Sequence, residues 1–219
     1  MLIVVREGRL LEVWVARESF DGLSSARDER VLSFPAYCNT MKEVKRFYLL
    51  LHPRPAYLIG SGRLGERVNF MAASWVTPIA EEPPLVGVAI GADSYTRELI
   101  DAYGEFTINV LPMDKVDLIY YAGSRSGREE DKTKQIKAVR GEKVQAPVAE
   151  GAVGVVECRI YTRVQAEDVV FYVGEVLSAR ADESVFDERK GWDASRVDLP
   201  LHNWGRGFYG LGRFRMAKA

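Results

Sequence analysis

The residues best suited to chemistry lie between Asn69 and Pro112, where small side chains and hydroxyls gather at the ends of apolar segments. The segment Asn69–Val76 reads Asn-Phe-Met-Ala-Ala-Ser-Trp-Val, with no branched side chain in its middle. Small side chains let a planar ligand approach the backbone, whose N–H and C=O groups can bond ring nitrogens and carbonyls. Ser74 adds a hydroxyl, and Trp75 could form one wall of such a ligand site. The pattern fits a site for a flat aromatic ring, and it fits equally an ordinary barrel strand whose alanines face a crowded core.

Two further segments carry candidate phosphate ligands. Ser94–Thr96 stands between an apolar run and an expected short helix, where hydroxyls and free backbone N–H groups suit an anion. Ser126–Arg128 forms a second loop-to-helix junction, and Lys132 follows one turn later with a positive charge. Each junction has a simpler interpretation as a capped helix, and for the second segment taken alone the simpler interpretation is favoured.

Other catalytic chemistries find little support. The loop Gly123–Gly127 does not match the G-x-S-x-G pattern of a nucleophilic serine, and no histidine stands near it in a triad-like context. The two histidines, His52 and His202, have no metal-ligating neighbours at a useful spacing. We therefore predict no catalytic side chain and no metal site. Whether His202 reaches a bound ring or is a polar core residue stays open, with the core interpretation preferred.

Two matches to G-x-G-x-x-G occur, at 60–65 and 205–210. A dinucleotide fingerprint needs a strand before the glycines and a helix directly after them. Residues 67–71 are strand-like, and the chain nearly ends after Gly210. The first match is therefore interpreted as a hairpin turn. Cys38 and Cys158 are far apart and belong to no C-x-x-C pair, so both are expected to be reduced and structural.

Composition narrows the class of protein. The chain has 219 residues, 47% of them hydrophobic, which is enough for one sizeable core. Its 30 basic and 31 acidic residues are interspersed, which argues against a nucleic-acid partner. The apolar runs are short and the N-terminus lacks the features of a signal peptide, so we expect neither a membrane span nor export, and the cytosol is the default location.

The elements that would position these residues are mostly strands. Alternating or continuous apolar runs bounded by turn residues predict strands at Leu2–Val5, Leu10–Ala16, Val31–Tyr37, Ala56–Gly60, Val68–Val76, Leu85–Ile90, Glu105–Leu111, Val153–Val164 and Val169–Ala179. Pro78 is expected to end its strand, and Leu85–Ile90 is apolar enough to be central. Helices are expected at Met41–Leu51, Thr96–Tyr103, Met113–Tyr121 and Arg128–Val139, the last as a solvated, charged helix. Many strands and few helices favour a closed or partly closed β-barrel.

An ordered set of short motifs resembles the flavin reductase-like family with the FMN-binding split barrel, and its flavoredoxin branch in particular. The matching text covers about 41–212 and comprises His52-Pro-Arg-Pro55, Asn69-x-Met-Ala-Ala-Ser-Trp75, Thr77-Pro78, Pro83-Pro-Leu-Val-Gly87, Ser94-Tyr-Thr96, Gly104-Glu-Phe106 with Asn109-Val110, Ser126-Gly-Arg128 with Asp131-Lys132, and Leu201-His202 with Gly207-x-Tyr209. Each piece is weak by itself, and the order makes the set fairly specific.

The resemblance implies a mainly β protein: a six-stranded Greek-key split β-barrel with a few short helices. It also implies a homodimer with FMN near the interface, reduced by NADH or NADPH. By analogy the cofactor-binding residues are Asn69, Met71, Ala72, Ala73, Ser74, Trp75, Val76, Ser94, Tyr95, Thr96, Asn109, Ser126, Gly127, Arg128 and Lys132. Within this set, Met71–Val76 would line the ring and ribityl chain, and the two junctions would hold the phosphate.

Three functions fit this resemblance. The favoured one is an NAD(P)H-dependent flavin reductase that passes electrons through bound FMN to an acceptor that the sequence does not identify. The alternatives are a non-enzymatic FMN electron carrier reduced by a protein donor, and an enzyme like pyridoxamine-phosphate oxidase. Met41 resembles the usual family start, so residues 1–40 are expected to be an N-terminal β-hairpin extension on a split-barrel domain at 41–219. The alternative left open is that residues 1–40 result from translation that starts upstream of Met41.

Overall fold

The computed structural model describes residues 5–6, 9–10 and 41–212, and it divides the chain into two compact units, 1–43 and 44–219. In the first unit, β1 (Val5–Arg6) and β2 (Arg9–Leu10) pair antiparallel, with Val5 opposite Leu10. The other strand expected before residue 40, at 31–37, lies outside the described residues, as does Cys38. The proposed boundary at residue 40 stays a prediction.

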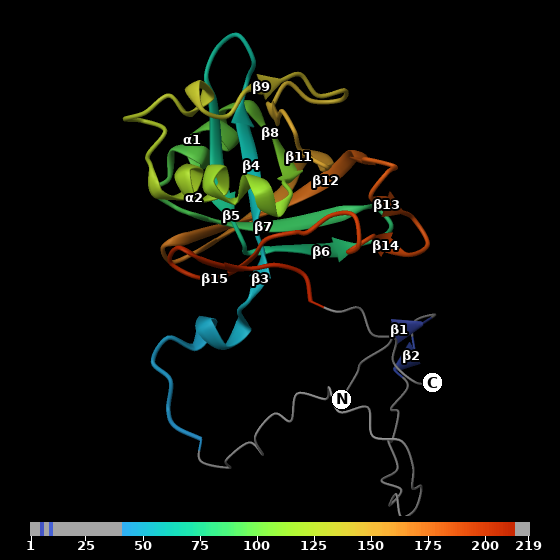
Figure 1. Cartoon of the computed structure of the whole chain (residues 1–219). Helices are drawn as coiled ribbons and strands as arrows, with labels where there is room; N and C mark the ends of the chain where they lie inside the picture. Colours follow the sequence, from blue (N-terminus) through green and yellow to red (C-terminus); the bar gives the residue numbers. More distant parts are fainter. Residues whose placement is uncertain (1–4, 7–8, 11–40, 213–219) are drawn as a thin grey trace, which may run out of the picture. The chain divides into compact units, whose positions relative to one another are not determined.

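The second unit is built on one antiparallel sheet of seven strands in the order β5-β4-β8-β11-β12-β7-β6 (Figure 1). Its members are β4 (Tyr57–Gly62), β5 (Val68–Ala73), β6 (Val76–Ala80), β7 (Leu85–Gly91), β8 (Glu105–Val110), β11 (Gly154–Ala166) and β12 (Val169–Ala181). The first and last strands of the sheet, β5 and β6, are separated only by Ser74 and Trp75. The sheet therefore closes through one continuous segment, which makes it a barrel.

Shorter elements surround the barrel. The helices are α1 (Tyr95–Tyr103) and α2 (Val116–Ser124), and the 3-10 turns are η1 (Phe47–Leu51), η2 (Met113–Lys115) and η3 (Lys132–Lys134). Both α-helices pack on β4 and β5 (Figure 1). The remaining strands are β3 (Arg54–Pro55), β9 (Ala138–Val139), β10 (Val148–Ala149), β13 (Phe186–Asp187), β14 (Gly191–Trp192), β15 (Leu201–Trp204) and β16 (Gly207–Tyr209). The β15–β16 hairpin forms a small separate sheet with β3.

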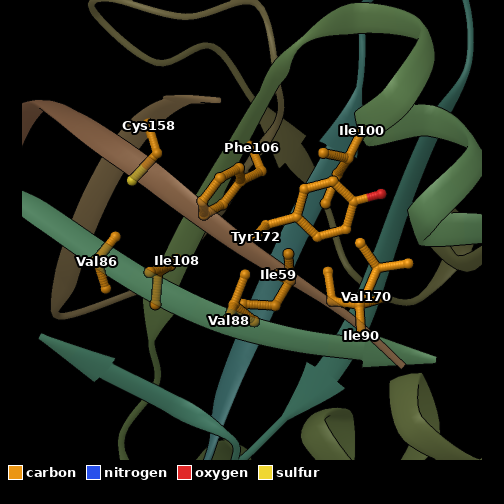
Figure 2. Packing of buried hydrophobic residues seen from close by; sticks show 10 residues of the cluster. All are labelled: Ile59, Val86, Val88, Ile90, Ile100, Phe106, Ile108, Cys158, Val170 and Tyr172. Carbon is orange, nitrogen blue, oxygen red and sulfur yellow. The ribbon is translucent and has the colours of Figure 1, made fainter. Parts of the chain in front are cut away.

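The barrel interior is filled by a cluster of buried apolar side chains. Figure 2 shows Phe106 and Tyr172 at its centre, with aliphatic side chains around them, and Ile100 reaches the cluster from α1. The Tyr172 hydroxyl donates to Asp101 Oδ1 at 2.7 Å, which satisfies its polar end at the edge of the core. A second cluster, which includes Leu58, Phe70 and Ile119, joins the outer face of β4 and β5 to α2.

The mainly β fold class is confirmed, and the long hairpin of β11 and β12 has the expected position with slightly longer strands. The strand expected at 85–90 is central, because β7 pairs with both β12 and β6. The sheet has seven strands rather than six because the segment expected as one strand at 68–76 is broken after Ala73. Pro78 does not end a strand: β6 runs through it, which is tolerated because β6 pairs on one side only, with β7.

Two expected helices are wrong. Residues 41–51 form only the short turn η1, with Phe47, Leu50 and Leu51 exposed, so no buried face stabilises a longer helix. Residues 128–139 form turns, η3 and β9 instead of a solvated helix. There the Asp131 carboxylate accepts from Thr133 N–H and hydroxyl, a local bond that competes with helix formation.

Among residues 41–212 and the two short N-terminal strands, no helix is long and apolar enough to cross a membrane.

Candidate functional site

A cavity of about 340 Å³ opens where β5 ends, and its size falls in the range of ~300–1,000 Å³ that is usual for small-molecule sites. Three elements form most of its wall: the end of β5 with the following serine, the last two turns of α2, and the β15–β16 hairpin. Their lining residues, together with Ala56, are Ala72, Ala73, Ser74, Ile119, Tyr120, Gly123, Ser124, His202, Trp204, Gly205 and Phe208. The sequence-predicted ring site at 72–74 therefore does border a cavity.

Small residues are required where α2 meets β5. A Cβ atom at Gly123 would lie 3.0 Å from the Cβ of Ala72, closer than ordinary packing allows. The helix can therefore approach the strand only because both positions are small. This close packing fixes the distance between two walls of the cavity without large side chains filling it.

A polar corner lies near the other end of β5. Asn69 is 2% exposed, and its Nδ2 donates to Thr96 Oγ1 at 2.9 Å, which joins β5 to the first turn of α1. Asn69 Oδ1 is buried and has no hydrogen-bond partner among the described residues. Gly127 packs directly against this oxygen: a Cβ at position 127 would lie 2.2 Å from Asn69 Oδ1 and 2.8 Å from the Tyr95 ring. A buried acceptor without a donor is costly, so this corner is suited to a ligand that donates a hydrogen bond.

The hydroxyls and cations of the two junctions have partners within the chain. Ser94 is the N-cap of α1 and accepts from Arg97 N–H at 3.1 Å, as the simpler interpretation expected. Ser126 Oγ accepts from Arg128 N–H at 3.3 Å. The Arg128 guanidinium bonds Glu98 at 2.5 Å and the Asp93 carbonyl at 2.9 Å. The structure thus brings the two junctions together, with Arg128 joining the second junction to α1.

Lys132 is buried rather than solvated. It is 3% exposed, and its ammonium group donates to the carbonyls of Phe70 at 2.8 Å and Ala122 at 2.7 Å. Burial lowers the pKa of Lys132 to about 8. In this arrangement the ammonium group joins β5 to α2. Its expected contact with a phosphate stays a prediction.

Of the predicted ligands, only Ala72, Ala73 and Ser74 line the cavity. Four of the remaining ones lie outside both the cavity and the polar corner. Met71 and Val76 pack against the barrel interior, and Trp75 is 39% exposed and tilts against Tyr48 with ring centroids 6.2 Å apart. The Asn109 amide is used within the core: Nδ2 donates to Leu58 O and Thr107 Oγ1, and Oδ1 accepts from Ala149 N–H. These bonds hold β8 to its neighbours, so Asn109 has a structural role here.

Sequence reasoning left the role of His202 open and did not predict Trp204, Phe208 or Tyr120. His202, Trp204 and Phe208 all line the cavity, and Tyr120 lines it from α2. His202 Nε2 lies 3.3 Å from Gly205 O, and burial lowers the pKa of its imidazole. The available signal was the alternation of aromatic residues and glycines after Leu201, which suits a tight hairpin that presents flat side chains.

Comparisons with known proteins show the family of this chain. Residues 49–212 match the family model described as flavin reductase like domain. An uncharacterized protein of Pyrococcus abyssi is 36% identical over 143 residues, which cover 65% of this chain and 83% of the relative. The NADH-dependent FAD reductase of Streptomyces globisporus is 28% identical over 116 residues, covering 52% and 64%.

Two solved structures have the same fold. The flavoredoxin of Desulfovibrio vulgaris (Miyazaki F) superimposes with a TM-score of 0.71 at 30% identity, covering 82% of this chain and 97% of its own. The FMN-binding protein of Thermus thermophilus, solved with bound 1-cyclohex-2-enone, gives a TM-score of 0.72 at 27% identity, covering 84% and 99%. The chain belongs to the flavin reductase-like family. The solved structures that it resembles are flavin reductase-like split barrels.

Proposed function

We propose that this chain binds FMN between β5, α2 and the β15–β16 hairpin, and that it is an NAD(P)H-dependent flavin reductase. The observation that carries the proposal is the combination of a cavity lined by Ala72, Ala73 and Ser74 with the unpartnered Asn69 Oδ1 on the same strand. A ring could lie against the small residues, and a hydroxyl of the attached chain could donate to Asn69.

The residues present fit such a cofactor. Ala72 and Gly123 place no large side chain between α2 and β5, and Gly127 lets the loop at 126–128 lie directly against Asn69. The N-terminus of α1 offers backbone N–H groups to a phosphate at Ser94–Thr96. Bound FMN would supply the redox chemistry by accepting hydride from a reduced nicotinamide and passing two electrons on. The protein then needs only to bind, orient and shield the reactants. This agrees with the sequence analysis, which predicts no catalytic side chain.

A flavin-free variant with an intact fold tests the site. Ser74→Leu adds bulk to the cavity wall outside the contact between Ala72 and Gly123. We expect this protein to be colourless after purification while the wild type is yellow and releases FMN on heating, identified by mass. Ala80→Leu, on the exposed end of β6, is the matched control and should remain yellow. Equal flavin content in the two variants, with unchanged circular dichroism, would exclude this cavity as the ring site.

The second candidate function is a bound-FMN electron carrier, favoured by the likeness to the flavoredoxin of Desulfovibrio vulgaris. Anaerobic stopped-flow mixing with NADH and with NADPH separates the two functions. Rapid bleaching of the flavin by either dinucleotide supports the reductase. Bleaching by dithionite but by neither dinucleotide supports the carrier. The family match favours both over an oxidase of the pyridoxamine-phosphate type.

We also propose that the chain forms a homodimer with the flavin near the interface. Tyr48 on η1 lies against Phe47, Trp75 and Trp204, with ring centroids 5.9, 6.2 and 6.4 Å apart, and these three partners are exposed. Exposed aromatic side chains that lie together are typical of an interaction site. Light scattering after size exclusion measures the mass directly, and a monomer at micromolar concentration would exclude this part of the proposal.

A further inference from the structure

The cavity entrance carries an arginine that the flavin site described above does not use. Arg206 lies between Gly205 and Gly207 on the turn of the β15–β16 hairpin, directly after two cavity-lining residues. Its guanidinium carbon is 5.2 Å from the centroid of the Tyr120 ring, and Tyr120 also lines the cavity. Stacking on the ring holds the guanidinium at the entrance while leaving its N–H donors available in the plane of the group.

Arg206 has no carboxylate partner among residues 41–212, whereas Arg128 is paired with Glu98. The nearest acid along α2 is Asp117, one turn before Tyr120 and exposed. An arginine that is positioned by an aromatic ring but not neutralised by an acid is suited to bind an anion from outside the chain.

A second cation lies beside the cavity although the chain as a whole has a formal charge of −1. The segment 44–56, which ends at the cavity-lining Ala56, contains Lys45, Arg46 and Arg54 and no carboxylate. Arg46 stacks on the cavity-lining Trp204, with its guanidinium carbon 5.1 Å from the ring centroid. A local excess of positive charge at a cavity entrance attracts anionic ligands and speeds their association.

The phosphate of the cofactor itself does not explain this charge. Its candidate ligands lie near Asn69, four residues along β5 from Ala73, which is roughly 13 Å in a strand. Arg206 and Arg46 at the entrance are therefore available to bind a second anion. A reduced nicotinamide dinucleotide carries its negative charge on phosphates some distance from the ring that donates hydride, which matches a cation at the edge of the cavity.

We propose that Arg206 binds the phosphate groups of the dinucleotide that reduces the flavin, and so makes the site selective for phosphate-bearing hydride donors. This inference rests on the proposed reductase function. Arg46 adds to the local potential, and Tyr120 acts as a positioning residue because it holds the guanidinium.

The experiment compares donors with and without phosphate on the flavin-loaded protein. Arg206→Gln should raise KM for NADH or NADPH about five- to tenfold and leave the rate with 1-benzyl-1,4-dihydronicotinamide, which has no phosphate, unchanged. Arg206→Lys should restore part of the loss. The matched control is Arg63→Gln, because Arg63 stacks on Tyr103 at 5.1 Å on the β4–β5 turn, six residues or roughly 20 Å along β4 from the cavity end.

Binding of ADP-ribose, measured by calorimetry on the same flavin-loaded proteins, tests the arginine without any hydride transfer. We expect Arg206→Gln to weaken binding about five- to tenfold and Arg63→Gln to leave it unchanged. Equal or absent ADP-ribose binding in the wild type and Arg206→Gln would overturn the inference. So would a lower FMN affinity of Arg206→Gln, because the arginine would then hold the cofactor. Failure of both dinucleotides to bleach the wild-type flavin would instead refute the reductase function, and the calorimetry still decides whether Arg206 binds a diphosphate.

Discussion

Lys132 makes an unusual contribution to stability that can be measured as a function of pH. Its ammonium group is 3% exposed and is held by two backbone carbonyls, of Phe70 and Ala122, with no carboxylate bonded to it. Burial lowers its pKa from the ordinary 10.5 to about 8. In the unfolded chain the group regains the ordinary value, so the unfolded state binds more protons than the folded state between these two pH values.

The sign and the size of the effect follow from this difference. Stability rises with pH wherever the unfolded state binds more protons, so the wild type should gain stability between about pH 8 and pH 10.5. The cost of keeping the ammonium charged in the fold is about 3 kcal/mol at neutral pH and falls to about 1 kcal/mol near pH 10. Lys132→Met keeps the length of the side chain and removes the titrating group. The wild type should therefore gain about 2 kcal/mol relative to this variant from pH 7 to pH 10.

Reversible denaturant unfolding of both proteins at pH 7, 8, 9 and 10 measures this difference, because other titrating groups cancel between the two. Cofactor content should be matched in the two preparations. A difference that stays flat across the series would refute the reasoning: it would mean that the two carbonyls compensate fully for the lost hydration of the ammonium group. A difference that falls with pH would mean that the fold favours the charged form.

The other predictions concern three buried polar groups. Thr96→Val removes the acceptor of Asn69 Nδ2, and we expect the free energy of FMN binding, measured by titration, to weaken by about 1–3 kcal/mol. Unchanged FMN affinity would exclude Thr96 from the proposed phosphate site. Burial by itself would raise the pKa of Glu157, but three backbone N–H donors and Arg180 outweigh it and lower the pKa. Glu157→Gln should therefore cost about 2–4 kcal/mol in denaturant unfolding at neutral pH, and the difference should shrink as pH falls through the lowered pKa; a constant difference down to acid pH would contradict this. Burial raises the pKa of the Cys158 thiol to about 12, so in a Cys38→Ser background the folded protein should not react with a disulfide reagent, and rapid labelling before unfolding would count against the burial.

Local sequence patterns were sufficient for most of the barrel. The strands β7, β11 and β12 were predicted because their apolar runs are long and bounded by clear turn residues. A capped helix was the simpler interpretation of Ser94–Thr96, and Ser94 is the cap of α1, because a capping side chain acts within one turn. The family resemblance was likewise carried by short motifs whose order survives in the sequence, and the family match confirms it.

Two of the failures depend in part on contacts between segments that are apart along the chain. Residues 128–139 carry enough charge for a solvated helix, but Lys132 is buried against carbonyls from Phe70 and Ala122, which lie 62 and 10 residues away. The break in the strand after Ala73 was also not predicted from the sequence. It depends on β5 and β6 lying at opposite edges of one sheet.

The sequence by itself determined the fold class, the family, and the small-residue strand that borders the cavity, because these depend on residue type and local spacing. Only the tertiary structure decided which side chains meet there. It brought Tyr120 from α2 and His202 with Arg206 from the C-terminal hairpin to one entrance, and it placed Asn109 in the core. The physical reason is that a side chain's role depends on its burial and its partners, and in a closed barrel those partners come from segments far apart along the chain.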